Sequence, residues 1–291
     1  MFTYSVIIPH KNCVPLLLRC FNSIPVRDDI QVVIVDDVST LTEEEHAQLE
    51  SLRSSRVQVL FLETTHFAGG ARNEGLALAE GRWLVFADSD DYFTEEAFKV
   101  MDDWKDSAYD MVFFAHESRL SDSLEQTVRS DERSEYVQRL ARDKGDKQAD
   151  EMLRYQNPVP WARMVRRELV ETHHLQFDCV RASNDAMFAL YAGYYAQSVA
   201  ADNRVTYCVT VREGSLTRTT SRESAYCRYE VAVRKYCFLR DHNLDHMLPW
   251  LTARVWGALR HYGFSEFRRY YRLARANHVN IWLGVTQRFH R

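Results

Sequence analysis

Short, uninterrupted apolar runs recur along the first part of the chain, and they constrain the fold more than any other feature of the sequence. They occupy residues 4–9, 31–35, 57–62, 83–87 and 111–115. Strands that helices cover on both faces read as continuous apolar runs, because neither face of the sheet meets water. We therefore expect these runs to be buried strands of a parallel sheet.

Helical patterns separate the runs. Residues 42–52 begin with Thr42 and carry Glu45 three positions later, the pair that forms a capping box at a helix start. Residues 68–79 form a second such pattern, and a third is expected to begin at Thr94. The alternation of strands and helices predicts an α/β fold: an open, mostly parallel sheet flanked by helices.

The composition changes after the fifth run. Residues 118–154 are rich in Ser, Asp, Glu and Arg and show little apolar periodicity, which predicts a mobile or solvated segment. Residues 157–167 restore order, a strand is expected at 205–211, and beyond Gly214 the patterns are helical. We divide the chain into residues 1–117, 118–220 and 221–291, the last being a basic, aromatic, helical C-terminal extension.

Charge and cysteine content narrow the class of protein. The 291 residues carry a formal net charge of -4, so nothing in the overall charge favours nucleic acid as a partner. The six cysteines form no C-x-x-C pair and fit no zinc template, which indicates reduced thiols in a reducing compartment. The first apolar run is too short for a signal peptide, and no stretch is suited to span a bilayer. These features predict a cytoplasmic protein.

Polar side chains follow three of the predicted strands, at the point where each strand ends. They are His10, Lys11 and Asn12 after the first strand, Asp36 and Asp37 after the second, and Asp88, Ser89, Asp90 and Asp91 after the fourth. The carboxyl ends of parallel strands meet at one edge of the sheet, and open α/β sheets bind their ligands there. The convergence predicts a ligand site at this edge.

Asp88 and Asp90 suggest a bound cation. They lie two residues apart and point to the same side if the extended backbone continues past the strand. Mg²⁺ and Mn²⁺ accept one or two protein carboxylates and complete their shell with phosphate oxygens and water. Helix capping is the structural alternative, and the string Asp-Ser-Asp-Asp taken alone would favour it. The position beside the other polar clusters favours the metal.

Three ordered strings carry a family resemblance: SVIIPHKN, VDDVS and AGGARNEGLALAEGRWLVFADSDD. They resemble the nucleotide-binding half of family 2 glycosyltransferases with the GT-A fold, and NPVPWARMVRRE, ASNDAMFAL and REGSLT extend the resemblance more weakly. The resemblance implies an inverting, Mn²⁺- or Mg²⁺-dependent enzyme. Such an enzyme moves a sugar from a nucleotide diphosphate, by family frequency UDP, to a glycan or lipid-linked glycan in bacterial surface polysaccharide or lipopolysaccharide synthesis.

The resemblance also implies roles for individual residues. For the donor site it implies Pro9, His10 and Asn12 at the nucleoside, Asp36 or Asp37 at the base, and Arg72 near the base and ribose. It further implies Asp88 at the ribose with Ser89 beside it, and Arg163 in an element similar to Trp-x-Lys. Arg212 with residues 215–217 would belong to a loop that can close over the diphosphate. Asp90 matches the metal ligand. Asp185 matches the general base of a Glu-Asp element, in which Asn184 replaces the usual Glu.

Each assignment has a structural alternative. Arg72 could pair with Glu74 or Glu80 on its own helix, Trp161 could belong to the core, and Asp185 could cap a helix. Two rival functions also exist. A sugar nucleotidyltransferase would carry a Gly-rich loop after the first strand, where this chain reads PHKNCVP, whereas a non-catalytic sugar- or nucleotide-sugar-binding protein would not need both Asp90 and Asp185.

The C-terminal extension is strongly basic. From Trp250 onward Glu266 is the only acid, whereas the same stretch carries eight arginines interleaved with aromatic residues. Basic helices with aromatic residues suit the surface of an anionic membrane. Helices packed on the catalytic domain would give the same pattern. The sequence therefore leaves two interpretations open, a peripheral contact with the inner face of the cell membrane and packing on the core.

Overall fold

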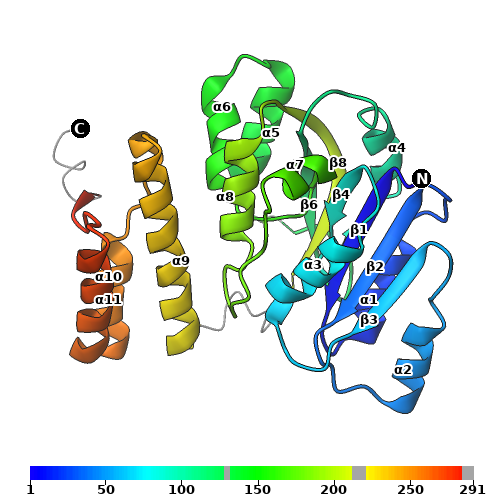
Figure 1. Ribbon diagram of the computed structural model, residues 1–291, viewed down its shortest axis with the longest axis horizontal. Coiled ribbons are helices and arrows are strands. Elements are labelled where there is room, and N and C mark those ends of the chain that lie inside the picture. The colour runs from blue at the N-terminus through cyan, green and yellow to red at the C-terminus, as the bar shows by residue number, and fades with distance from the viewer. Residues whose placement is uncertain (128–131, 212–220, 284–291) are drawn as a thin grey trace.

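One eight-stranded sheet organises the chain (Figure 1). The computed structural model describes residues 1–127, 132–211 and 221–283. The strand order is β3-β2-β1-β4-β7-β6-β8-β5. The strands are β1 Tyr4–His10, β2 Ile30–Asp36, β3 Val57–Phe61, β4 Trp83–Phe86, β5 Tyr92–Phe93, β6 Met111–Leu120, β7 Arg163–Arg166 and β8 Val199–Val211. All five predicted runs are strands.

Helices cover the sheet and extend beyond it. They are α1 Val14–Asn22, α2 Glu43–Glu50, α3 Phe67–Leu78, α4 Ala97–Asp102, α5 Glu132–Arg142, α6 Lys147–Glu151, α7 Arg167–Thr172, α8 Ala186–Tyr195, α9 Arg222–Asp241, α10 Thr252–Tyr262 and α11 Phe264–Ala276, with a π-helical turn η1 at Met152–Gln156 and a 3-10 turn η2 at Asp245–Met247. The capping box of α2 is formed as predicted, with Thr42 and Glu45 bonding reciprocally to each other's backbone N–H.

The first half of the sheet is parallel. β1 pairs in parallel with β2 and β4, and β2 pairs in parallel with β3. The register sets His10 opposite Asp36, so the carboxyl ends of β1 and β2 are level. Beyond β4 the sheet is mixed, because β7 runs antiparallel to both β4 and β6.

Two apolar cores lie on opposite faces of the sheet. Val6 and Ile8 face one core, where they pack with Leu17 of α1. Ile7, between them, faces the other core together with Ala71 of α3. Alternate residues of one strand therefore enter different cores, and this explains why the strands read as unbroken apolar runs.

Two predictions about local structure were wrong. The helix after the fourth strand begins at Ala97 rather than Thr94, because Thr94 extends the pairing of β5 with β8 by donating from its backbone N–H to the carbonyl of Thr206 (3.1 Å). The described residues between 118 and 154 are not simply a solvated segment. They contain the end of β6, helix α5, which buries Val137 and Leu140 in the core, and helix α6, which buries Ala149 there.

The C-terminal helices form a third core of their own. Residues of α9 such as Tyr229 and Tyr236 pack with Val255 of α10 and Tyr270 of α11. In Figure 1, α9 stands between the sheet-containing part and the pair α10 and α11. Among the residues described, no helix combines the length and the apolar character needed to cross a bilayer.

We predict opposite stability changes for two glycine substitutions. Gly193→Ala should destabilise the protein by about 1–3 kcal/mol, because the new Cβ would lie 2.2 Å from the backbone oxygen of Arg154. Gly257→Ala is the control, since nothing lies within 4 Å of its added Cβ. It should stabilise α10 by about 0.5–1 kcal/mol. Thermal unfolding midpoints test both changes, and an unchanged midpoint for Gly193→Ala would contradict the close packing of α8 against η1.

Candidate functional site

A buried histidine–aspartate pair joins the ends of β1 and β2. The Nδ1 atom of His10 lies 2.7 Å from Oδ2 of Asp36, and both side chains are almost completely buried. Asp36 also accepts hydrogen bonds from the backbone N–H (2.9 Å) and hydroxyl (2.5 Å) of Ser39. Burial alone would raise the pKa of Asp36, but these bonds outweigh it and lower the pKa below its usual value. Asp36 is thus ionised, and its carboxylate holds the loop after β2 in place.

Asp37 joins three loops at the same edge. Its carboxylate accepts hydrogen bonds from the hydroxyl of Thr65 (2.7 Å) and the backbone N–H of His66 (2.6 Å), and Lys11 Nζ lies 3.3 Å away. Asn12, in the left-handed region at φ 63°, accepts a bond from the backbone N–H of Thr40 (2.8 Å). The predicted nucleoside-binding loops are therefore tied to one another, while the choice between Asp36 and Asp37 at the base stays a prediction.

Arg72 links the donor half of the predicted site to the segment that carries Asp185. Its Nη2 donates to Oδ1 of Asp88 (2.5 Å), and its Nη1 donates to Oδ1 of Asn184 (3.0 Å). The guanidinium also lies over the ring of Phe177, 5.3 Å from its centroid. The alternative in which Arg72 pairs with an acid of its own helix is wrong.

A glycine lets α3 approach that segment closely. A Cβ at Gly69 would lie 2.0 Å from the backbone oxygen of Asp178 and 2.9 Å from Cβ of Asn184. Only a residue without a side chain fits between them. The first turn of α3 therefore places both Arg72 and its partner Asn184.

Asp185 occupies the N-cap position of α8, but its side chain makes no capping hydrogen bond. The carboxyl is partly buried, and burial raises its pKa above the usual value. The charge of Asp88 raises the pKa further, whereas Arg72 and Arg163 oppose the shift. Helix capping therefore does not orient this side chain, and its carboxyl lies in the electrostatic field of Asp88, in the loop that follows β4.

The acidic loop after β4 is held through its backbone. The N–H of Asp88 donates to the hydroxyl oxygen of Tyr207 (2.8 Å), and the carbonyl of Asp90 accepts from Arg19 Nη2 and Thr210 Oγ1 at 2.6 Å each. Asp88, Ser89 and Asp90 remain partly exposed. With these backbone atoms held by residues from α1 and β8, the loop has a defined course at the edge of the sheet.

Asp91 is a buried member of the loop that the sequence analysis did not assign. Its Oδ1 accepts the backbone N–H of Thr210 (2.7 Å). Burial, with the charges of Asp88 and Asp90, raises the pKa of Asp91 well above its usual value. Three acids thus lie within four residues, and burial with the neighbouring charges opposes the ionisation of Asp91.

The donor set fits a cation that shares its shell with phosphates. Among the residues described, no three His, Cys, Asp or Glu side chains group as a metal site. Asp88 and Asp90 are two carboxylates in a negative loop, and Asp88 already bonds to Arg72. A closed structural site would need about four protein ligands. Two carboxylates instead match Mg²⁺ or Mn²⁺ bound together with a diphosphate.

The Trp161 and Arg163 positions lie deeper than the loops. Trp161 belongs to the core, as its structural alternative stated, and stacks on Tyr207 with ring centroids 5.4 Å apart. Arg163 is almost fully buried, and its Nη2 donates to the backbone oxygen of Asn157 (3.0 Å). Burial, with Arg133, lowers the pKa of Arg163 to about 9, so it stays charged at neutral pH. Arg212 and residues 215–217 lie outside the described residues.

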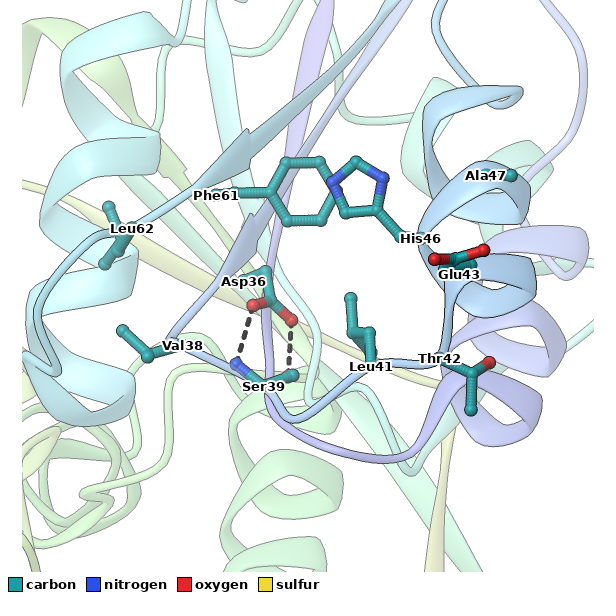
Figure 2. Close-up of a pocket in the computed structure, with 10 residues that line it drawn as sticks. All are labelled: Asp36, Val38, Ser39, Leu41, Thr42, Glu43, His46, Ala47, Phe61 and Leu62. Carbon is teal, nitrogen blue, oxygen red and sulfur yellow. Dashed lines mark hydrogen bonds between the residues drawn. The ribbon is translucent and has the colours of Figure 1, made fainter.

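A cavity of about 480 Å³ opens beside the end of β2 (Figure 2). Its lining comes from the ends of β2 and β3, from the loop between β2 and α2, and from α2 itself, and includes Asp36, Leu41, His46 and Phe61. The rings of His46 and Phe61 stack with centroids 4.6 Å apart. Of the predicted donor residues that the structure describes, Asp36 is the one that lines it. No sequence signal singled out His46 or Phe61, because their contact joins α2 to β3.

Comparison with solved structures shows the fold. TarS of S. aureus (residues 1–349), in complex with UDP-GlcNAc, aligns with a TM-score of 0.63 at 18% identity, covering 95% of this chain and 92% of that chain. The mannosyltransferase PcManGT of Pyrobaculum calidifontis, in complex with GDP-Man and Mn²⁺, aligns with a TM-score of 0.55 at 15% identity, covering 98% and 83%. These likenesses confirm the predicted GT-A-type α/β fold.

Sequence comparison identifies the family. EpsH of Bacillus subtilis (strain 168), which is named as a glycosyltransferase, is 22% identical over 254 residues, or 82% of this chain and 70% of EpsH. The family pattern described as Glycosyl transferase family 2 matches residues 5–173, more than half of the chain. The matched part includes β1, the acidic loop and Arg163. The protein therefore belongs to glycosyl transferase family 2, as the ordered motifs predicted.

Proposed function

We propose that the protein transfers a sugar, with inversion, from a nucleoside diphosphate donor to a hydroxyl group of a glycan. The observation that carries the proposal is the double hydrogen bond of Arg72 to Asp88 and Asn184. It brings the acidic loop and the start of α8 to one edge of the sheet. The proposed donor site and the proposed base would thus be adjacent.

The donor would bind at the acidic loop. Asp90, with Asp88, would hold a divalent cation, which would neutralise negative charge developing on the leaving nucleoside diphosphate. The complexes of TarS with UDP-GlcNAc and of PcManGT with GDP-Man and Mn²⁺ support a nucleotide-sugar donor and a metal. We propose UDP as the nucleotide and assign His10, Asn12 and Asp36 or Asp37 to the nucleoside.

Asp185 would act as the general base. The acceptor hydroxyl gives its proton to the Asp185 carboxylate while its oxygen bonds to the anomeric carbon, and the bond to the nucleoside diphosphate breaks. A raised pKa makes the carboxylate a better proton acceptor, since Brønsted behaviour favours a base whose pKa lies nearer to the working pH. A single displacement inverts the anomeric configuration.

The acceptor would be a polymer of the cell surface or its lipid-linked precursor. The name of TarS, a poly(ribitol-phosphate) β-N-acetylglucosaminyltransferase, supports a polymeric acceptor. The matched part of that protein is 105 residues at 35% identity, or 34% of this chain. A screen of nucleotide sugars, read as release of free nucleoside diphosphate with and without added polymer, tests the donor and acceptor classes separately.

Asp90→Asn should abolish most of the metal-dependent transfer. The substitution removes a negative charge from the proposed cation site but keeps the side-chain size, and the backbone bonds of residue 90 remain. Donor turnover should fall by at least about 100-fold, since one electrostatic contact to the reacting charge is typically worth that much. Chelator should reduce the parent to a similar rate. Full activity of Asp90→Asn in chelator would remove the metal from the mechanism.

Asp185→Asn should lower kcat by about 10²–10⁴-fold while donor binding stays near normal. The parent should lose activity as the pH falls through the raised pKa of Asp185, because the base must be ionised to accept a proton. The loss should begin above the pH at which an ordinary aspartate protonates, and the variant should lack this acid limb. An unchanged kcat with weakened donor binding would instead place Asp185 among the binding residues.

Arg72→Lys should weaken donor binding by about tenfold, because an ammonium group cannot reproduce the planar fork that bonds both Asp88 and Asn184. Arg82→Lys is the matched control, since Arg82 forms an ion pair with the exposed Asp106 at 3.2 Å. Isothermal titration with the donor measures both variants. Equal affinity of Arg72→Lys and the parent would show that the double bond does not shape the donor site.

A further inference from the structure

An exposed cluster of aromatic rings lies on α10, on α11 and just after them. Trp256 is 42% exposed, Phe264 is 64%, Tyr271 is 41% and Trp282 is 50%. The partly buried Phe267 links them, with ring centroids 5.3 Å from Trp256, 6.0 Å from Phe264 and 6.1 Å from Tyr271, and Trp282 lies 6.0 Å from Trp256. We call these five residues the aromatic face.

The interface of α10 and α11 with α9 is formed mainly by other residues. The side of α10 and α11 that faces α9 is already filled by Val255, Ala258, Tyr270 and Ala274, all of which are buried. A contiguous exposed apolar cluster is unusual on a soluble surface and marks a place where something binds. The alternative that the C-terminal aromatic residues are core therefore holds for Tyr270, and Phe267 packs against that core, whereas Trp256, Phe264 and Tyr271 are exposed.

Arginines flank the aromatic face on the same side of each helix. Arg260 lies four residues after Trp256, Arg268 four after Phe264 and Arg275 four after Tyr271, a spacing that places both members of each pair on one helix face. Arg272 lies next to Tyr271. All four arginines are exposed, and none forms an ion pair within the part of the chain that the structure describes.

The aromatic face has no acid of its own to neutralise these charges. Glu266 is the only acid from Trp250 to the end of the sequence. It is buried, bonds to Arg222 and lies 3.6 Å from Arg269. A chain with a net charge of -4 therefore concentrates positive charge around one exposed aromatic cluster.

We propose that the aromatic face and its four arginines form a docking surface for an anionic lipid bilayer. Aromatic rings favour the boundary between headgroups and acyl chains, and arginines around them attract anionic headgroups. In Figure 1, α10 and α11 stand beyond α9, away from the sheet, so docking there leaves the edge that carries the acidic loop accessible. The surface holds the protein at the membrane and does not depend on the identity of the donor.

Vesicle co-sedimentation tests the proposal with the full chain. The protein should pellet with vesicles of phosphatidylglycerol in phosphatidylcholine and stay in solution with phosphatidylcholine alone, and added salt should release it because exposed charges are screened. Arg268→Glu with Arg272→Glu should weaken binding by more than about tenfold. Trp256→Ser with Phe264→Ser should weaken it by a similar factor at unchanged charge.

The matched control reverses two exposed cations on other helices. Arg142→Glu with Lys147→Glu, on α5 and α6, changes the net charge as much as the arginine pair on α11 does. This control should bind like the parent, and release of nucleoside diphosphate from the donor should be the same in all variants. Equal loss of binding in the control would overturn the proposal, as would negligible pelleting of the parent. The proposal would also fail if the parent did not bind vesicles and light scattering showed a dimer instead, which the aromatic substitutions dissociate.

Discussion

The rest of the site depends on the hydrogen bonds that the buried guanidinium of Arg72 makes. A buried cation costs several kcal/mol of desolvation unless anionic or polar partners surround it. Arg72 is almost fully buried, and its partners come from the end of β4 and the start of α8. Its Nε has no hydrogen-bond partner among the described residues. In the folded protein Asp88 and Asn184 are therefore both held at the Arg72 guanidinium, and the two halves of the site meet at this one cation.

Contacts to backbone atoms hold the acidic loop in place, in addition to the ion pair of Asp88 with Arg72. Tyr207, Thr210 and Arg19 bond to backbone atoms of residues 88–90, and Tyr207 in turn stacks on Trp161. These contacts fix the course of the loop. Burial, with the charges of Asp88 and Asp90, raises the pKa of Asp91 and so opposes its ionisation. The proposed divalent cation would offset that repulsion.

Features that depend on local pattern could be predicted from the sequence, and features that depend on long-range pairing could not. The strands were predictable because both faces are buried, and the polar clusters because each follows a strand. Helix α5 was missed because its few buried residues, Val137 and Leu140 among them, sit in a charged segment. The stacking of His46 on Phe61 and the bonds that hold Asp91 join elements far apart in the chain, so no local signal reveals them.

Asp185 shows how the two halves of the site share one electrostatic field. Burial and the charge of Asp88 raise its pKa, whereas Arg72 and Arg163 oppose that shift from two different elements. Arg163 is itself buried, and burial lowers its pKa to about 9, while the charge of Asp185 opposes that shift. Asp88 belongs to the predicted donor half of the site. A change in the charge of Asp88 therefore alters the pKa of Asp185 even when Asp185 itself is unchanged. The proposed donor site and the candidate base are thus coupled through charge as well as through the bonds of Arg72.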